Sequence, residues 1–355
     1  MMKLNSEQIE RFKKDGVLVI ENVLTKDEID EARKGLYASL ELKGVSMKDT
    51  SSFSKIAELS STHGAGGVLD IFYEDWKFKL LENPIPVSIL QQLWAHTYGQ
   101  ENSSLDEAFS HPFGDFDCSS AYAYIDRICV RLPDSFSHLC QDSGESSSSS
   151  SASSSFKKDR RRLLQRGLSP HLDCCPDRLY DASNMKKWKP IQAFLSLTDT
   201  LECNQGGFEA CLGHHRHFSE WAKTRKWTQA TKGADTSGTP PICIGEFTAM
   251  RSVEDADILS RMKHVPCRRG SLVVWDNRIP HANSRFNSSD IVREVVYFGL
   301  LPNIQLNREY AVEQLANMRR GQLPSDQWHA RNERVYCSYE FSELGRKLLA
   351  IDPWP

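Results

Sequence analysis

The part of the chain after residue 167 is a series of short apolar segments rich in β-branched residues. Glycine, proline and asparagine separate these segments, as they do at turns between strands. Many short strands joined by such turns favour an antiparallel sandwich or jelly roll. The predicted strands cover residues 168–174, 191–197, 207–212, 270–275 and 293–300.

Helical patterns flank this strand-rich region. Asn5 or Ser6 can cap a short helix, and the buried strand 16–20 begins at the glycine that ends it. Thr25 and Glu28 have the spacing of a capping box, which predicts a second helix that runs to about residue 42. Further helices are predicted over residues 86–98, 218–226 and 309–319. The fold class that we expect is therefore mainly β with flanking helices.

One segment has very low complexity. Between residues 146 and 155 only Ala152 interrupts a run of serines, and the basic stretch 157–162 follows. Such a run buries too little apolar area to offset the entropy lost on ordering. We predict a flexible loop over 142–162, which is either a solvated insertion or a segment that closes over an anionic ligand.

The charge balance excludes several function classes. Lys and Arg number 44 and Asp and Glu 47, so the net charge of -3 lacks the basic excess of a dedicated nucleic-acid binder.

No apolar run approaches the roughly 18 residues that span a bilayer. The first residues lack the apolar core of a secretory signal, and the last three, Pro353, Trp354 and Pro355, are not a peroxisomal address. We expect a cytoplasmic protein that acts on a small molecule, away from membranes and nucleic acids.

The ten cysteines do not have the spacing of a disulfide framework or a zinc site. No Cys-x-x-Cys pair occurs, and the only close pair, Cys174 and Cys175, is vicinal. Adjacent cysteines form an ordinary structural disulfide with difficulty. We expect the cysteines to be mostly reduced and to pack as small apolar residues.

Three polar elements, far apart in the sequence, contain the candidate metal-binding and anion-binding residues. His171 and Asp173 are two apart on a predicted strand, so their side chains point to the same face and can reach one metal ion. His281 lies just beyond the apolar strand 270–275, where a jelly roll can aim it inward. Arg293 begins another apolar strand and needs an anionic partner, either a ligand carboxylate or a neighbouring acid such as Glu294. Two imidazoles and one carboxylate form the facial triad of non-haem iron oxygenases.

At these residues the sequence resembles the phytanoyl-CoA dioxygenase family of iron(II)/2-oxoglutarate oxygenases. The segment 270–293 carries the strongest similarity, and the opening 4–20 and the turn 204–216 are also similar to that family. In the turn, Leu212 and His214 stand where the family has proline and serine. We therefore assign no catalytic role to the turn.

The resemblance implies a fold, a cofactor set and a reaction. It implies a double-stranded β-helix in which His171, Asp173 and His281 bind iron(II) and Arg293 holds the distal carboxylate of 2-oxoglutarate. The implied reaction consumes O2, converts 2-oxoglutarate to succinate and CO2, and hydroxylates an organic substrate, with ascorbate as a candidate reductant. Related halogenases have a small residue where this chain has Asp173, so hydroxylation is favoured over halogenation.

Five further side chains are candidates for contacts in the site. The candidates for binding the cosubstrate are Tyr124, Arg131, Gln192 and Phe194. The first two lie on a predicted strand over 121–132, and the other two share a face of the strand 191–197. Trp188 is a candidate for substrate contact. Packing in the core or at the surface is the alternative role for each.

The predicted site also bears on domain organisation. A length of 355 residues suggests about two domains. His171 and His281 are 110 positions apart yet would meet at one metal, so a boundary between them is not expected. We predict a single domain over 1–355, with an insertion at 218–265 and a helical extension at 303–355.

Two other functions use the same features. A non-catalytic jelly-roll binding protein would keep the fold without turnover, although an intact triad with Arg293 argues against it. A nucleic-acid or protein demethylase would use the same triad. The near-neutral charge disfavours that reading, while the basic segment 157–166 supports it.

Overall fold

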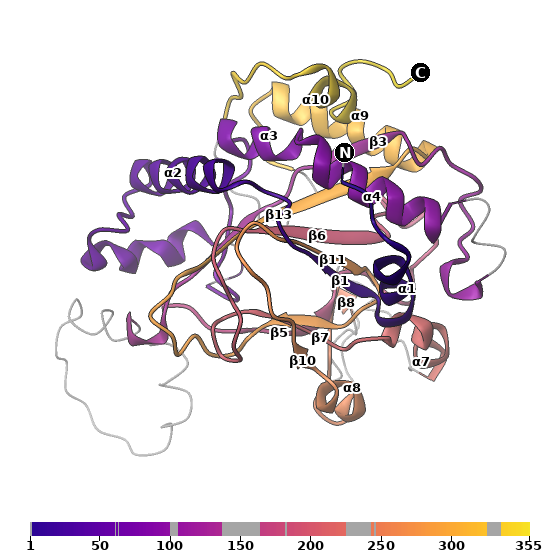
Figure 1. Ribbon diagram of the computed structural model, residues 1–355, viewed down its shortest axis with the longest axis horizontal. Coiled ribbons are helices and arrows are strands. Elements are labelled where there is room, and N and C mark those ends of the chain that lie inside the picture. The colour runs from indigo at the N-terminus through magenta and orange to yellow at the C-terminus, as the bar shows by residue number, and fades with distance from the viewer. Residues whose placement is uncertain are drawn as a thin grey trace, which may run out of the picture.

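The computed structural model of the protein describes residues 2–60, 62, 64–99, 106–136, 164–181, 183–224, 243–244, 246–324 and 335–355. The predicted serine-rich loop over 142–162 lies outside these residues. Figure 1 shows two sheets, one above the other, with most of the helices over the upper sheet. This arrangement of antiparallel sheets and helices confirms the mixed fold class, and the assignment to a double-stranded β-helix stays a prediction.

The upper sheet, here called the large sheet, runs in the order β1-β11-β6-β13-β4-β2, with β3 also paired to β13. Its strands are β1 (Val17–Ile20), β2 (Val68–Leu69), β3 (Ala121–Tyr124), β4 (Ile128–Arg131), β6 (Ile191–Ser196), β11 (Leu272–Asp276) and β13 (Arg293–Pro302). The strand predicted over 121–132 is therefore two strands, β3 and β4. They pair with opposite halves of β13, which is long enough to bind both.

The lower sheet, here called the small sheet, runs in the order β10-β7-β12-β5-β9-β8. Its strands are β5 (Leu168–Leu172), β7 (Phe208–Ala210), β8 (Cys243–Ile244), β9 (Phe247–Ala249), β10 (Lys263–His264) and β12 (His281–Asn283). Three of these strands come from the segment predicted as an insertion at 218–265. That segment therefore extends the small sheet as well as supplying two helices.

The helices of the described residues include the two predicted from capping signals, which begin where those signals place them. They are α1 (Ser6–Asp15), α2 (Lys26–Leu42), α3 (Asp75–Leu81), α4 (Pro84–His96), α7 (Phe218–Thr224), α8 (Ala256–Ser260), α9 (Gln305–Arg319) and α10 (Glu343–Leu348). Asn5 and Thr25 both form complete capping boxes, and Gly16 ends α1 in the left-handed conformation at φ 68°. Short 3-10 helices cover Thr50–Leu59, Glu107–Phe109 and His214–Arg216. None of the helices within the described residues has the length and apolar character needed to cross a membrane.

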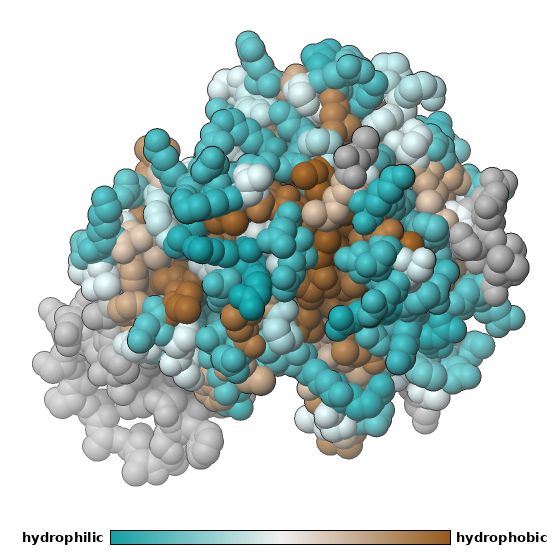
Figure 2. Space-filling view, viewed as in Figure 1, coloured by the Kyte–Doolittle hydropathy of each residue, from teal (hydrophilic) through white to brown (hydrophobic). Residues whose placement is uncertain are grey.

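Alternation along β13 divides the core into two layers. Val296 and Phe298 point to the outer face of the large sheet and join the main core beneath the helices. Val295 and Tyr297 point to the inner face, toward the small sheet. In the face seen in Figure 2, apolar side chains show through the middle of the mostly hydrophilic surface. The inner layer is the one in which polar side chains meet.

Most of the described cysteines are reduced, as expected, but one pair is not. Cys175 forms a disulfide with Cys243 across 68 residues, so the expectation fails for these two. The expectation fails because the fold brings Cys175 next to Cys243, a distant cysteine on β8, so the disulfide does not involve the vicinal Cys174. The free cysteines among the described residues are Cys118, Cys129, Cys174, Cys203, Cys211, Cys267 and Cys337.

An ion pair joins the partly exposed Arg33 on α2 to a buried carboxylate on the outer face of the large sheet. Glu294 is fully buried, and its carboxylate accepts hydrogen bonds from Nε of Arg33 at 2.6 Å and from the Tyr37 hydroxyl. Glu294 and Arg293 are adjacent on β13, so they point to opposite faces. Glu294 is therefore not the acid that pairs with Arg293.

We predict that Arg33→Met lowers the free energy of unfolding by about 2 kcal/mol, because it leaves the Glu294 charge buried without its cation. Lys26→Met is the matched control, since the ion pair of Lys26 with Asp30 is exposed and is expected to contribute less than about 0.5 kcal/mol. Urea unfolding monitored by circular dichroism measures both values. Equal losses in the two variants would contradict this account.

Candidate metal centre

The antiparallel pairing of β5 with β12 brings two histidines together. His171 and His281 are direct partners in the register of these strands, and their ring centroids are 4.4 Å apart. Asp173 follows β5 directly. Its Oδ1 lies 3.4 Å from Nε2 of His171, and its Oδ2 lies 3.3 Å from Nε2 of His281. One donor atom from each of the three side chains lies within 4.8 Å of the others.

Backbone hydrogen bonds orient both imidazoles for metal binding. Nδ1 of His171 lies 2.8 Å from the carbonyl oxygen of Ser169, and Nδ1 of His281 lies 3.0 Å from that of Ile279. A carbonyl oxygen only accepts, so in the neutral form of each imidazole Nδ1 is the protonated nitrogen and Nε2 has the free lone pair that a metal needs. Metal-binding histidines are held in this way in many proteins. The two Nε2 atoms and the Asp173 carboxylate thus form a donor set for one divalent ion.

The electrostatics of the cluster favour the forms that bind a metal. Partial burial acts to raise the pKa of the Asp173 carboxyl, but the charges and hydrogen bonds of His171 and His281 outweigh it and hold this pKa well below its usual range. Burial lowers the pKa of His281, and the nearby His171 lowers it further, while Asp173 opposes both effects. The carboxylate and the neutral imidazole of His281 are the favoured states near neutral pH.

Aromatic rings hold the histidines in place from both sheets. Phe247 on β9 stacks on His171 with ring centroids 4.9 Å apart and an interplanar angle of 24°. Trp275 on β11 packs against His281 with centroids 5.1 Å apart. These contacts restrict the rotamers of both ligands, so the cluster is preorganised.

The cluster opens into a cavity of about 1490 Å³ between the two sheets. Polar and charged side chains that line it include Tyr124, Asp126, Arg131, Asp134, Arg166, Lys189, Gln192, Glu246, Asn283, Arg285 and Tyr297. The volume exceeds the roughly 300–1,000 Å³ of many small-molecule sites, which leaves room for two ligands. The wall is mixed in polarity, so it is suited to ligands with charged groups.

Two buried arginines lie side by side on the inner face of the large sheet. Arg131 on β4 and Arg293 on β13 are direct register partners. Nη1 of Arg293 lies 3.2 Å from Sγ of Cys129, and Nη2 of Arg293 has no hydrogen-bond partner among the described residues. Nη2 of Arg131 donates to Oδ1 of Asp134 at 2.8 Å, and Nε of Arg131 is unpartnered within the same described part of the chain. These buried guanidinium N–H groups are donors whose hydrogen bonds an anion could complete.

The other sequence candidates divide into those on the cavity and those behind it. Tyr124 and Gln192 line the cavity, and Nε2 of Gln192 is buried without a partner among the described residues. Phe194 is not part of the cavity wall, but its ring lies 5.3 Å from the Arg293 guanidinium and supports it. Arg131 lines the cavity, whereas Arg293 is buried beside it on β13 and is not among the lining residues.

Trp188 packs in the hydrophobic core and does not contact the cavity. Its side chain is fully buried in the core under the helices, against Tyr98 and His111, and Asn307 hydrogen-bonds its backbone. It does not line the cavity. The suggested substrate contact is therefore not supported, because the residue lies before β6 begins and on the helix side of the sheet.

Two residues of the site were not singled out from the sequence. Asn283 is two positions after His281 on the same strand face, and its Nδ2 donates to the carbonyl oxygen of Gly66 at 3.1 Å. The two-residue period of a strand could have identified it. Phe247 lies in the segment predicted as an insertion, and no local pattern indicates that its ring reaches His171.

Comparison with known proteins shows the fold only. No protein-family model matches the chain, and no curated protein sequence matches it. GlcNAc Inducible Gene 2 (DUF1479) from Candida albicans has a similar structure, with a TM-score of 0.70 at 14% identity over 99% of this chain and 78% of that chain. The hypothetical protein JW0805 from Escherichia coli gives a TM-score of 0.62 at 14% identity over 98% and 82%. The non-heme alpha ketoglutarate dependent carbocyclase SnoK is more distant, with a TM-score of 0.46 at 15% identity over 84% of each chain. Membership of the phytanoyl-CoA dioxygenase family stays a prediction.

We predict that His281→Ala weakens the binding of Mn(II), used as a probe ion, by about 100-fold or more, because it removes one of three donors. Calorimetric titration of the metal-free protein measures the affinity. His217→Ala is the control, since His217 is exposed and lies outside the cluster. Unchanged affinity in His281→Ala would show that the ion binds elsewhere.

Proposed function

We propose that the protein is an iron(II)/2-oxoglutarate-dependent dioxygenase that hydroxylates a small or medium organic substrate. Succinate and CO2 would be the products of the cosubstrate. The donor set supports this proposal, because two neutral imidazoles and one carboxylate leave coordination positions open for a chelating keto acid and O2. When bound, iron(II) and 2-oxoglutarate supply the O2-dependent oxidation of a substrate C–H bond.

The unpartnered donors of Arg131, which lines the same cavity as the triad, and of its register partner Arg293 are the single observation that carries the proposal. A bare metal site would need no second charged group, but 2-oxoglutarate has a distal carboxylate that must be paired when it is buried. Nη2 of Arg293 and Nε of Arg131 are the buried donors that such a carboxylate would satisfy. A guanidinium can hold a carboxylate with two parallel hydrogen bonds.

Different residues of the chain would bind the metal and the cosubstrate. His171 and His281 offer neutral nitrogen donors, and Asp173 offers a negative charge that offsets part of the charge of a divalent ion. The unpartnered Nε2 of Gln192 is available to the cosubstrate or the substrate. Asp173 occupies the position where a halide would otherwise need space, which favours hydroxylation.

The size and polarity of the cavity bear on the substrate. A dicarboxylate the size of 2-oxoglutarate fills only part of about 1490 Å³, so a second organic ligand fits beside it. Charged side chains of both signs, such as Lys189 and Glu246, line the remaining wall. These groups favour a substrate with polar or charged substituents over a purely apolar one.

We predict that Arg293→Lys and Arg131→Lys each weaken the binding of 2-oxoglutarate to the Mn(II)-loaded protein by about tenfold or more, because lysine cannot form the two-pronged contact. Calorimetry under anaerobic conditions measures the dissociation constant. Arg166→Lys is the matched control, since Arg166 lies on the exposed wall of the same cavity and is expected to change binding by less than about twofold. Equal affinities in all three variants would contradict the assignment of the anion site.

We also predict oxygen-dependent formation of succinate from 2-oxoglutarate by the iron(II)-loaded protein, and its loss in Asp173→Ala. Without the true substrate this turnover is expected to be slow, so succinate is quantified after long incubation against an anaerobic sample. Binding of metal and 2-oxoglutarate without succinate, across a panel of organic acids and amines, would instead support a non-catalytic binding protein. Succinate formation stimulated by methylated nucleic acid or peptide would favour a demethylase.

A further inference from the structure

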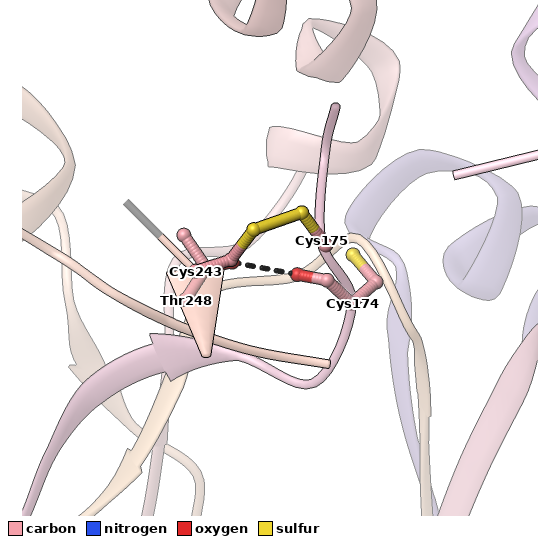
Figure 3. Close-up of a disulfide and its surroundings, with 4 residues drawn as sticks. All are labelled: Cys174, Cys175, Cys243 and Thr248. Carbon is pink, nitrogen blue, oxygen red and sulfur yellow. Dashed lines mark hydrogen bonds between the residues drawn. A yellow bond between two sulfur atoms is a disulfide. The ribbon is translucent and has the colours of Figure 1, made fainter. Parts of the chain in front are cut away.

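A disulfide connects the segment after Asp173 to a separate hairpin. Cys175 lies two residues beyond Asp173, and its sulfur is bonded to Cys243 on β8 (Figure 3). Among the described residues, β8 pairs with β9 alone and lies at the edge of the small sheet. The disulfide therefore ties the outermost strand of the sheet back to the segment that carries a metal ligand.

Hydrogen bonds close this connection into a ring. Cys243 is the register partner of Thr248 on β9, and Thr248 is the register partner of Leu172 on β5. The Thr248 hydroxyl also donates to the carbonyl oxygen of Cys174 at 2.9 Å, as Figure 3 shows. Leu172 and Cys174 lie directly before and after Asp173. The backbone on both sides of this ligand is thus held by the β8–β9 hairpin.

The same hairpin contacts a second metal ligand. Phe247 begins β9 and stacks on the His171 ring at 4.9 Å. β8 has two residues and β9 three, and strands this short are not stable as an isolated hairpin. The disulfide is the covalent attachment of this hairpin to the site, and its pairing with β5 is a noncovalent one.

From this connectivity we propose that the Cys175–Cys243 disulfide is a redox-responsive positioning element of the metal centre. With the bond intact, the hairpin holds Phe247 over His171 and fixes the backbone that carries Asp173. With the bond broken, the hairpin loses its covalent link to the segment after Asp173. It keeps noncovalent contacts, which include its pairing with β5, the hydrogen bond of Thr248 to Cys174 and the ion pair of Glu246 with Lys187, and the ligands lose preorganisation. The inference rests on the proposed metal site.

The redox step needs a partner of a defined class. A dithiol reductant attacks one sulfur, the Cys175–Cys243 bond breaks, and the second thiol of the reductant closes its own disulfide. Two electrons and two protons pass to the protein, which then carries two thiols. Disulfides are uncommon in reducing compartments, and those that occur there are usually transient or redox-sensing, so occupancy of this bond would follow the redox state of its surroundings.

Mn(II) binding to the full-length protein tests the proposal. We predict that the oxidised wild-type protein binds Mn(II) and that dithiothreitol treatment, followed by anaerobic removal of the reagent, weakens the dissociation constant by about tenfold, as loss of supporting contacts around metal ligands does. The double variant Cys175→Ser/Cys243→Ser is expected to match the reduced protein. Re-oxidation of the wild-type protein should restore the original affinity, which a loss of folding would not permit.

Controls separate this proposal from the function that it rests on. Cys203→Ser alters an exposed free cysteine and should bind Mn(II) like the wild type before and after reduction. Mass spectrometry of peptides from the alkylated protein must show Cys175 linked to Cys243. Strong Mn(II) binding that is the same in both redox states would overturn this inference and leave the proposed function intact. Failure of the oxidised wild-type protein to bind Mn(II) would overturn both.

Discussion

The pairing of β5 with β12 is the interaction on which the rest of the site depends. It sets His171 directly opposite His281, and a shift of one residue would turn one imidazole to the other face of the sheet. The register shifts between His281 and Asn283, and the Asn283 side chain donates a hydrogen bond to the carbonyl oxygen of Gly66. The register of two short strands therefore decides whether a metal can bind.

A second pairing, in the facing sheet, sets the position of the two arginines proposed to bind the cosubstrate. β13 pairs with β4 so that Arg293 and Arg131 meet, and it pairs with β6 so that Tyr297 meets Phe194. Alternation sends the neighbouring Glu294 to the outer face, where Arg33 pairs with it. Two adjacent residues of β13 thus place a cation, Arg293, on the inner face and an anion, Glu294, on the outer face. The two sheets place the metal donors and the arginine donors on facing walls of one interior.

Much of this arrangement could be predicted from the sequence, because local chemistry determines it. The capping boxes at Asn5 and Thr25, the strand that begins at Arg293 and the shared face of His171 and Asp173 all follow from patterns within a few residues. Contacts between distant segments could not be predicted in this way. Spacing alone does not show that Cys175 bonds to Cys243, or that a ring from β9 covers His171. Trp188 is of a residue type that often contacts substrates, but it lies on the outer face of the large sheet and packs in the core there.

A crystal structure grown without oxygen in the presence of iron(II) and 2-oxoglutarate tests the central claim most directly. The account predicts one iron bound by Nε2 of His171, Nε2 of His281 and a carboxylate oxygen of Asp173. It also predicts that the keto acid chelates this iron and that its distal carboxylate contacts Arg293 or Arg131. Iron bound by other residues, or 2-oxoglutarate held away from both arginines, would contradict the account.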